Sequence, residues 1–569
     1  MTLLKLAAIT GLILLAGLGL IFFETVTTAF TSGTAAKPIT DHRPAACGPA
    51  PTAEPFYVEP VTSPTTLLTQ TVNVRLGNGR AITITGGAAT AAVTGTFSSN
   101  TPVAITVPLW PNATHQLTAS GQVEYAAGCY YTLDTTRDRY GSLLTIVQVS
   151  HRTYLPVILR DYAAPVAGRP FPDTTDGIFV FNDQLATWDM SEAQFQFAAT
   201  HYVGTQKVLR DDARHLRQYN PNFLVLHYRL GQALGHSEAD AACQPTTNYL
   251  SIIDGNQWVQ EWPGDANVQD QWFFKYAGSR VFSCSNGHYL MELNNADWRT
   301  WWSTQVISQL LDNEDDGLFA DSYSIPNYFG GSDFNPHLPD VDSTFEAQWA
   351  AREHAFTDYI RSRFAGRWKW LPNIGAWITS RDPSDYANLD GAMIEGFAEW
   401  GSGGYFGQDD WALQQNRILP LIKADKILIG QTYPDPTDVN ERLFVLGTYL
   451  LVKGKYTYLN LDTGLDPEWF PEYTSDLGAP IDALPNDIAA YLDPTWQVYV
   501  RHYAKGLVLV NPTDTSHSIN LGGTYYRANP SGGGPVPSDG SAPGLINYAP
   551  VTSFTLNANQ AAIVLNAAP

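Results

Sequence analysis

Short apolar runs and longer segments with helical spacing alternate through the middle of the chain. Between residues 173 and 478, runs such as 317–321 (GLFAD) and 391–395 (GAMIE) are typical of strands buried on both faces. Segments such as 296–313 and 409–424 repeat apolar residues every three or four positions, as amphipathic helices do. This alternation indicates parallel strands that are joined by helices.

The same region contains eight strand-like runs, and a helix or helical turn is expected after each of the first seven. Eight such units favour a closed (β/α)8 barrel, and a doubly wound open sheet is the alternative. The predicted strands are 177–182, 205–209, 223–228, 317–321, 370–375, 391–395, 426–430 and 456–460, and the main predicted helices are 191–202, 211–218, 296–313, 341–365, 409–424 and 438–453.

The two flanking regions alternate apolar and polar residues with a period of two, between turn residues. The expected architecture is therefore an α/β (β/α)8 TIM barrel flanked by N-terminal and C-terminal antiparallel β-sandwich domains. The predicted divisions are 1–36 (signal peptide or signal anchor), 37–65 (linker), 66–154 (accessory β-sandwich), 155–172 (linker), 173–478 (barrel) and 479–569 (C-terminal β-sandwich).

An apolar run from Leu6 to Phe23 follows a single basic residue, Lys5. This pattern predicts export of the chain, either by a cleaved signal peptide or by a segment that stays in the membrane. We expect an extracellular or cell-surface protein, with a possible membrane tether through residues 6–23.

The chain has four cysteines, and an even number in an exported protein favours disulfides. Their grouping favours Cys47–Cys129 and Cys243–Cys284, which is one of three possible connectivities. Free buried thiols are the alternative.

Lysine and arginine number 33 against 55 aspartates and glutamates, so the net charge is −22. Such a charge repels nucleic acid and anionic membrane surfaces, and it favours neutral or cationic partners. The chain contains no zinc-protease, serine-hydrolase or P-loop motif and no C-x-x-C pair. We expect no cofactor, no metal and a monomer.

Polar residues end seven of the eight predicted strands, where the active sites of such barrels lie. Two of them are acids at matching positions: Asp321 and Glu395 each come five residues after the aspartate of an Asp-Gly pair, Asp316 or Asp390. The other candidates for contacts with a substrate are Asp183, His227 with its neighbours Tyr228 and Arg229, Tyr323, Asn373, Tyr433 and Asn460.

Asp321 and Glu395 end the fourth and sixth strands, and alternate strands contribute to the same inward layer. A carboxylate pair of this kind is what glycosidic-bond cleavage requires. The separation of the carboxyl groups would distinguish retention, at about 5–5.5 Å, from inversion, at about 6.5–9.5 Å. The alternative is that each acid caps a helix or a loop, and Asp316 and Asp390 are expected to serve turns.

A long insertion from Gly231 to Tyr289 is rich in aromatic residues, among them Trp258 and Trp262. Flat aromatic rings beside amides suit the apolar faces of sugars, and Trp262 is a candidate for this role. A small satellite core stapled by Cys243–Cys284 is the alternative. The glycine-rich stretch 401–407 after the sixth strand fits a mobile loop at the active site.

The order of DGLFADSY, NIGAW, DGAMIEGF and IGQTY along the chain resembles hypothetical glycosyl hydrolase family 15. It resembles, more distantly, the polygalactosaminidase-like and α-galactosidase-like barrels. The latter resemblance implies a nucleophile at Asp321 and an acid/base at Glu395, although those barrels use aspartate at both places.

These observations lead to one hypothesis and one rival. The hypothesis is an exported glycoside hydrolase that acts on a carbohydrate with a carboxylate pair, Asp321 and Glu395, and retains the anomeric configuration. The rival is a non-catalytic carbohydrate-binding or cell-surface protein that keeps the barrel as a scaffold.

Overall fold

The computed structural model describes eight strands between residues 56 and 149, and residues 168–234, 239–245, 269–461 and 463–569. The first eight strands form one antiparallel sheet in the order β3-β2-β1-β8-β7-β6-β5-β4. They are β1 (Phe56–Val58), β2 (Thr71–Leu76), β3 (Ala81–Thr85), β4 (Thr90–Thr96), β5 (Pro102–Pro108), β6 (Gly121–Ala126), β7 (Cys129–Asp138) and β8 (Gly141–Val149).

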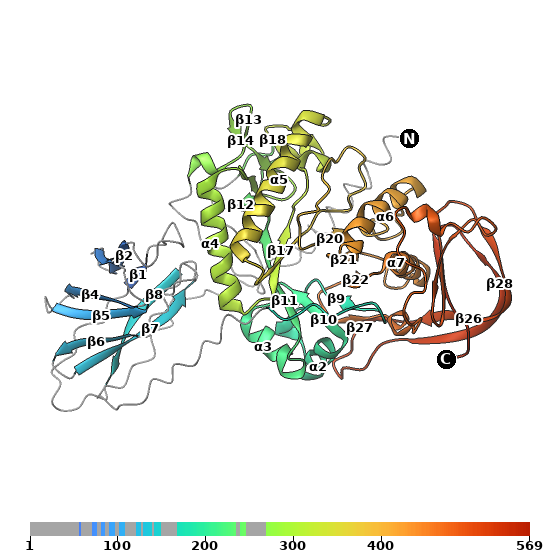
Figure 1. The fold of residues 1–569 in the computed structure, drawn as a ribbon, viewed down its shortest axis with the longest axis horizontal. Coiled ribbons are helices and arrows are strands. Elements are labelled where there is room, and N and C mark those ends of the chain that lie inside the picture. The colour runs from blue at the N-terminus through green and yellow to red at the C-terminus, as the bar shows by residue number, and fades with distance from the viewer. Residues whose placement is uncertain are drawn as a thin grey trace.

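A second eight-stranded sheet is entirely parallel and curves into a barrel (Figure 1). Its order is β19-β17-β11-β10-β9-β22-β21-β20, and a parallel bridge between Asn373 and Met393 links the two end strands. Its strands are β9 (Val180–Phe181), β10 (Tyr202–Gln206), β11 (Leu224–Leu230), β17 (Gly317–Asp321), β19 (Lys369–Pro372), β20 (Gly391–Glu395), β21 (Ile427–Thr432) and β22 (Thr457–Leu461).

The interior of the barrel is a packed apolar core, because every second residue of a strand points to the same face. Phe171, which precedes the first strand, packs into this core against Phe181 and Tyr458. The core residues are Phe171, Phe181, Leu224, Leu226, Phe319, Leu371, Met393, Ile427, Ile429 and Tyr458.

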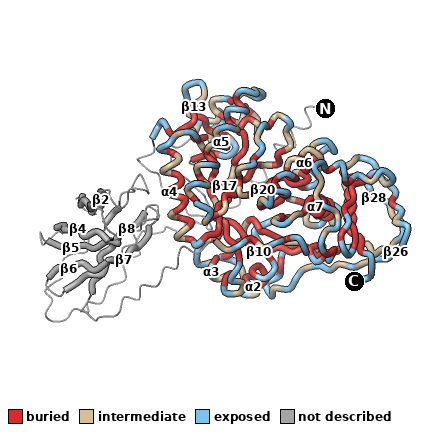
Figure 2. The backbone as a smooth tube through the Cα atoms, in the orientation of Figure 1, coloured by how far each residue is buried: buried red, intermediate tan, exposed pale blue. Residues whose placement is uncertain are grey.

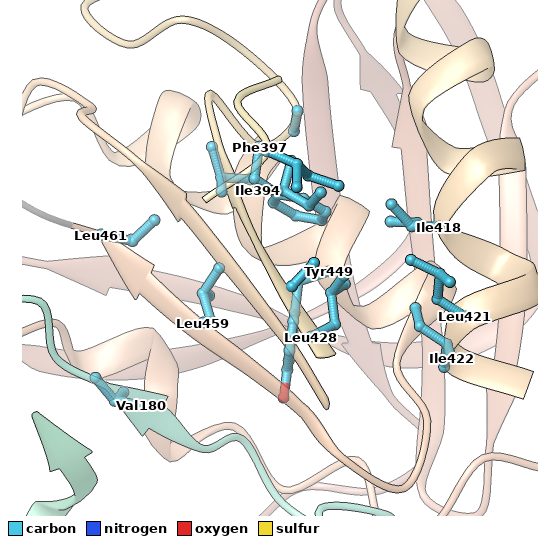
Figure 3. Packing of buried hydrophobic residues seen from close by; sticks show 14 of the residues in the cluster. Val180, Ile394, Phe397, Ile418, Leu421, Ile422, Leu428, Tyr449, Leu459 and Leu461 are labelled. Atoms are coloured by element: carbon cyan, nitrogen blue, oxygen red, sulfur yellow. The ribbon is translucent and has the colours of Figure 1, made fainter. Parts of the chain in front are cut away.

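Helices lie outside the barrel and cover the opposite face of its strands. Figure 3 shows Ile394 and Leu428 on that face, with Ile418 and Ile422 of one helix and Tyr449 of another. The helices are α2 (Glu192–His201), α3 (Arg210–Tyr219), α4 (Ala296–Asn313), α5 (Ser343–Phe364), α6 (Gln408–Lys423) and α7 (Val439–Val452), each within two residues of its predicted bounds. Short 3-10 turns are η2 (Thr187–Asp189), η3 (Asp270–Trp272), η4 (Pro326–Phe329), η5 (Gly331–Asp333), η6 (Pro471–Thr474) and η7 (Ile488–Tyr491).

Polar residues at the ends of the strand–helix loops explain where several helices begin. Asn295, Asp342 and Asp438 each accept hydrogen bonds from two backbone N–H groups of the first turn of α4, α5 and α7. Ser191 and Gln194 form a reciprocal capping box at the start of α2.

The second strand lies three residues earlier than the sequence predicts, at Tyr202–Gln206 rather than 205–209. The sequence pattern did not reveal this strand, because Gly204 interrupts its apolar residues and glycine is rare inside strands. A Cβ at this position would lie 2.4 Å from the carbonyl oxygen of Leu224, so the close approach of β10 to β11 requires glycine. The apolar residues Val208 and Leu209 instead lead into α3.

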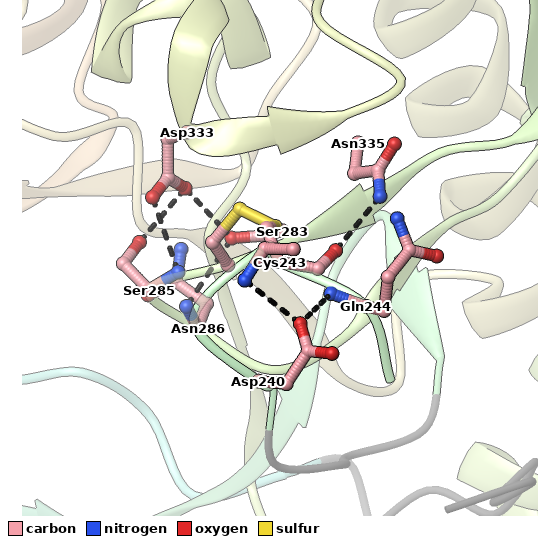
Figure 4. The surroundings of a disulfide bond; sticks show 10 residues. Asp240, Cys243, Gln244, Ser283, Ser285, Asn286, Asp333 and Asn335 are labelled. Carbon is pink, nitrogen blue, oxygen red and sulfur yellow. Dashed lines mark hydrogen bonds between the residues drawn. A yellow bond between two sulfur atoms is a disulfide. The ribbon is translucent and has the colours of Figure 1, made fainter. Parts of the chain in front are cut away.

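The insertion after β11 contributes to a small sheet beside the barrel. Its strands are β12 (Ala233–Leu234), β15 (Phe282–Ser283) and β16 (Tyr289–Leu290), joined by β18 (Phe334–Asn335) from the loop after β17, and a separate hairpin pairs β13 (Lys275–Tyr276) with β14 (Ser279–Arg280). The predicted Cys243–Cys284 disulfide is present, with a Cα–Cα distance of 5.3 Å (Figure 4). The Cys47–Cys129 prediction lies outside the residues whose side chains are described.

The buried aromatic residues of the insertion divide between a small satellite core, which holds Phe274, and the main core, which holds Trp272 and Phe273. Phe274 packs against Trp349 of α5, and Trp272 packs against Trp298 of α4. All four side chains are buried. This part of the insertion therefore stabilises the side of the barrel instead of presenting rings to solvent.

The C-terminal region forms one antiparallel sheet of five strands, in the order β24-β25-β29-β26-β28. The strands are β24 (Tyr499–Tyr503), β25 (Gly506–Asn511), β26 (His517–Ser531), β28 (Leu545–Leu556) and β29 (Gln560–Leu565), and a short ladder of β23 (Glu468–Trp469) and β27 (Gly534–Pro535) adjoins them. Here, as in the N-terminal region, the strands are antiparallel as expected, and the division into two packed sheets is not confirmed.

The barrel and the C-terminal sheet share one hydrophobic core. Gly447 of α7 faces Val508, Val510 and Ala561 of the sheet, which places this buried helix between the two. Figure 2 shows the contrast between the buried α7 and the exposed outer hairpin of β26 and β28. Among the described residues, no helix combines the length and apolar character needed to cross a membrane.

Candidate active site

A ring of polar residues lies directly above the apolar core of the barrel. Seven of its eight members follow a residue of that core by two positions on the same strand or just beyond it, so they point to the same face. We call these residues the polar ring: Asp183, Lys207, Tyr228, Asp321, Asn373, Glu395, Gln431 and Asn460.

Asp321 and Glu395 meet across this ring through one amide group. The Nδ2 atom of Asn373 donates hydrogen bonds to Oδ1 of Asp321, at 2.9 Å, and to Oε2 of Glu395, at 2.5 Å. Asn373 follows β19, the strand between β17 and β20, and Gly375 N–H donates to its Oδ1 atom at 3.0 Å. The backbone of the loop thereby sets which way the amide faces.

The shared amide limits the distance between the two acids. The bonded oxygen atoms of Asp321 and Glu395 lie no more than 5.4 Å apart, which is the sum of 2.9 Å and 2.5 Å. The two carboxyl groups are therefore close enough to act on the same glycosidic bond.

Asp321 receives two further hydrogen bonds from uncharged donors. Tyr228 Oη donates to its Oδ2 atom at 2.8 Å, and the backbone N–H of Ser322 donates to Oδ1 at 2.8 Å. Ser322 adopts a φ of 56°, a left-handed conformation that turns the chain sharply just after the strand. Both oxygens of Asp321 are therefore acceptors held in place by neutral groups.

Glu395 is held by a row of donors from the next two strands. Tyr433 Oη donates to Oε1 of Glu395 at 2.5 Å, and Gln431 Nε2 donates to Tyr433 Oη at 3.0 Å. Asn460 Nδ2 in turn donates to Gln431 Oε1 at 3.2 Å. The hydrogen bonds thus run without a break from Tyr228 on β11 to Asn460 on β22.

The surroundings of Glu395 favour its protonated form. Burial raises the pKa of this carboxyl group above its ordinary value, and the neighbouring Asp321 carboxylate raises it further. The hydrogen bonds from Tyr433 and Asn373 act in the opposite direction, yet the net pKa shift is upward. Glu395 is therefore the member of the pair that is suited to carry a proton.

Asp183 and Lys207 form an ion pair on the opposite side of the ring. Lys207 Nζ lies 2.6 Å from Oδ2 of Asp183 and 5.3 Å from the centre of the Tyr228 ring. The second carboxylate oxygen of Asp183 is buried and has no hydrogen-bond partner among the described residues. A buried acceptor of this kind is suited to a hydroxyl group of a ligand.

The glycine-rich stretch 401–407 lies against the same site. Ser402 N–H donates to the carbonyl oxygen of Tyr433 at 3.1 Å. Gly401 has a φ of 98°, and a Cβ there would lie 2.4 Å from that carbonyl oxygen. The glycine thus allows the loop to pack directly on Tyr433, which binds Glu395.

Two predicted substrate contacts do not face the ring, and their assignment is corrected. His227 follows Leu226 of the barrel core, so its side chain lies on the outer face of β11, where its Nδ1 atom is 3.0 Å from Asp315 Oδ2. Tyr323 is buried, and its hydroxyl donates to the carbonyl oxygen of Glu353 in α5 at 2.7 Å. Both side chains stabilise the contact between the barrel and its helices.

The remaining candidates fall into three groups. Three of them, Asp183, Asn373 and Asn460, are members of the polar ring. Tyr433 follows the ring residue Gln431 by two positions and binds Glu395. Trp262 lies outside the described residues. Asp316 and Asp390 lie at the opposite, N-terminal ends of their strands.

Sequence reasoning missed Lys207 and Gln431, and it left Tyr228 as a neighbour of His227. Gln431 and Tyr228 could have been identified from the sequence, because each lies two positions after the last apolar residue that its strand directs into the barrel. Gln431 follows Ile429 in this way, and Tyr228 follows Leu226. Lys207 was missed because the strand that precedes it was predicted three residues too late in the sequence.

The described residues contain no group of three or more His, Cys, Asp or Glu side chains placed to hold a metal ion. The groups that the polar ring offers to a ligand are carboxyl, hydroxyl, amide and ammonium groups.

The solved structures that match this chain are only distantly similar to it. They include a cycloisomaltooligosaccharide glucanotransferase from Paenibacillus sp. (TM-score 0.27, 11% identity, 90% of this chain and 65% of that one). A maltogenic α-amylase from Thermotoga neapolitana (0.32, 11%, 68% and 98%) and an α-amylase from Malbranchea cinnamomea (0.32, 10%, 68% and 96%) also match. At these TM-scores and identities we take nothing about activity from them. Among curated protein sequences, none matches the chain significantly.

A family model gives the clearer relationship. The model of hypothetical glycosyl hydrolase family 15 matches residues 217–507, which include Asp321, Asn373, Glu395 and Gln431. The match covers more than half of the 569 residues. The chain therefore belongs to hypothetical glycosyl hydrolase family 15 and, with it, to the glycoside hydrolases.

Proposed function

We propose that this protein is a retaining glycoside hydrolase in which Asp321 is the nucleophile and Glu395 is the general acid/base. The observation that carries the proposal is the single amide nitrogen of Asn373, which binds both carboxyl groups and holds their nearest oxygens within 5.4 Å, the sum of the two hydrogen bonds. The carboxyl groups of retaining glycosidases lie about 5–5.5 Å apart, closer together than those of inverting enzymes. The spacing therefore supports direct attack by a carboxylate.

In the first step, an oxygen of Asp321 attacks the anomeric carbon and the glycosidic C–O bond breaks. Glu395 transfers its proton to the leaving oxygen, and the sugar remains bound to Asp321 as an ester. In the second step, Glu395 takes a proton from water, the water oxygen attacks the anomeric carbon, and the ester bond breaks. Two displacements at one carbon restore the original configuration.

The hydrogen bonds to each acid fit these roles. Tyr228, Asn373 and Ser322 N–H stabilise the negative charge of Asp321 without supplying a proton donor strong enough to neutralise it. Burial and the adjacent charge keep Glu395 protonated to a higher pH than an exposed glutamate. Asp183, with one oxygen unpaired among the described residues, is suited to bind a sugar hydroxyl.

The substrate proposed is a neutral or amino-sugar polymer outside the cell. A net charge of −22 disfavours polymers of uronic acids, because like charges repel. The Cys243–Cys284 disulfide is consistent with an oxidising compartment.

The first experiment is a screen for released reducing ends, with a panel of neutral, amino-sugar and uronic-acid polysaccharides. Wild-type protein is compared with Asp321→Asn and Glu395→Gln at matched concentration. Release by the wild type alone supports the proposal. Binding of a polysaccharide without release, by all three proteins equally, would instead favour the non-catalytic carbohydrate-binding protein.

The roles within the pair are tested with azide and the aryl glycoside of the sugar found in the screen. With Asp321→Ala, azide takes the place of the nucleophile and should give a glycosyl azide of inverted configuration. With Glu395→Ala, azide attacks the enzyme ester and should give the retained configuration. The opposite pattern of products would exchange the two roles.

A further inference from the structure

The donors that reach Glu395 from β21 and β22 all point in one direction. Asn460 donates to Gln431, Gln431 donates to Tyr433, and Tyr433 donates to Oε1 of Glu395. Because Gln431 supplies a hydrogen to the Tyr433 oxygen, the tyrosine hydroxyl has to direct its own hydrogen elsewhere. The acceptor that it meets is Oε1 of Glu395.

Gln431 is built into the strand end that carries the acid. Its Cα is paired with that of Glu395 in the parallel register of β20 and β21. Its carbonyl oxygen accepts hydrogen bonds from Gly396 N–H, at 3.0 Å, and Phe397 N–H, at 2.9 Å, directly after Glu395. Its side chain is 1% exposed, so water does not compete for its amide.

The two oxygens of Glu395 therefore differ. Oε1 accepts the Tyr433 hydroxyl on the side away from Asp321, whereas Oε2 accepts the Asn373 amide that also binds Asp321. Oε2 thus lies on the side of the nucleophile. A proton on Oε2 would therefore lie between the two carboxyl groups, where the Asp321 carboxylate stabilises it.

We propose that Gln431 is a positioning residue that orients the Tyr433 hydroxyl onto Oε1 of Glu395, so that the acid proton is carried by Oε2 on the Asp321 side. This proposal rests on the proposed function, in which Glu395 is the acid. Gln431 touches no reacting atom in this scheme, and it acts through Tyr433.

Apart from Tyr433 itself, the variants below leave the charged and titratable groups that face Glu395 unchanged. Asp321 on β17, Tyr228 on β11 and Asp183 after β9 face it, and Lys207 is paired with Asp183. A change in titration that follows loss of Tyr433 or Gln431 is therefore attributable to the hydrogen-bond chain.

The test follows the Glu395 carboxyl group itself and needs no substrate. Full-length protein is labelled with [δ-13C]glutamate, the Glu395 signal is identified by its absence in Glu395→Gln, and its chemical shift is followed against pH. The variants are Tyr433→Phe and Gln431→Met. The matched control is Tyr449→Phe, which removes a buried hydroxyl that donates to the Thr457 carbonyl, away from the ring.

Loss of the Tyr433 hydroxyl removes a donor that stabilises the charged form, so the pKa of Glu395 should rise by about one unit or more. Gln431→Met leaves the hydroxyl present but no longer directed, and the rise should be smaller, roughly half a unit. Tyr449→Phe should titrate like the wild type. The basic limb of kcat/KM should move upward by the same amounts on the substrate found in the screen.

A Gln431→Met protein that titrates like the wild type, while Tyr433→Phe shifts, would overturn the role of Gln431. An unshifted titration in both variants would overturn the chain as a whole. Failure of the proposed function has a separate signature, because it appears as an absence of hydrolysis in the screen whatever the titration shows.

Discussion

The strands β17 and β20 each carry an acid at both ends, and the two ends treat it differently. At the N-terminal end, Asp316 is paired with Arg169 and Arg217, and Asp390 is paired with Arg361. At the C-terminal end, the hydrogen bonds that Asp321 and Glu395 receive come from uncharged groups. The same type of residue, five positions along the same strand, is therefore either a structural anion or a titratable group.

The N-terminal acids, Asp316 and Asp390, join neighbouring strands through hydrogen bonds to the backbone. Asp316 Oδ2 accepts a hydrogen bond from Val225 N–H of β11, and Asp390 Oδ2 accepts one from Trp370 N–H of β19. In each pair the acid reaches the strand beside its own, and an arginine neutralises it. Pairing with a cation satisfies a buried charge and leaves it little chemical use. Neutral donors at the other end leave a carboxyl group able to attack or to exchange a proton.

The largest effect is expected when the C-terminal acid of β17 loses its charge. Asp321→Asn should reduce turnover by roughly 10³-fold or more, which corresponds to about 4 kcal/mol of activation free energy. Asparagine has the same size but only one acceptor oxygen, so its NH2 group must face either Tyr228 or the donors Asn373 and Ser322, and the free energy of unfolding should fall by about 1–3 kcal/mol. Rates on the substrate from the screen and urea denaturation measure the two quantities. Near-normal turnover would remove Asp321 from the mechanism.

The N-terminal acid of the same strand should show the reverse result. Asp316→Asn leaves the buried guanidinium of Arg217 without its anion, which should lower the free energy of unfolding by about 3–5 kcal/mol. The kcat of the protein that remains folded should be unchanged, because Asp316 lies at the other end of the barrel. Asp390→Asn is the matched comparison, and its cost should be smaller, about 1 kcal/mol, since its partner Arg361 is 37% exposed.

The smallest effect concerns the pH dependence of stability. The pKa of Glu395 in the folded protein is raised above its ordinary value of 4.5. As the pH rises past 4.5, the unfolded chain releases this proton while the folded protein retains it, so the wild type loses stability up to the folded pKa. Glu395→Gln has no such loss, and its stability relative to wild type should increase from pH 4 to pH 8. Urea denaturation at several pH values checks this trend, and a constant difference would contradict it.

Much of the barrel could be predicted because its signals are local. The bounds of α4 were predicted to the residue, since apolar spacing and the Asn295 cap lie within one stretch of chain. The alternation around Phe319 and Met393 placed Asp321 and Glu395 on inward faces. Where a strand depends on its neighbour, as Gly204 does on Leu224, the local pattern was misleading.

Local patterns in the sequence were enough to predict the eight barrel strands, the six helices, the two acids at matching strand ends and the Cys243–Cys284 pairing. Three contacts became visible only in the folded protein. The Asn373 amide joins the two acids, and Tyr228 rather than His227 faces them. Gln431 donates a hydrogen bond to Tyr433, which in turn binds Glu395. The physical reason is that hydrophobic periodicity sets which face of a strand a side chain occupies. Hydrogen-bond partners from different strands depend on register and closure, which apolar periodicity does not encode.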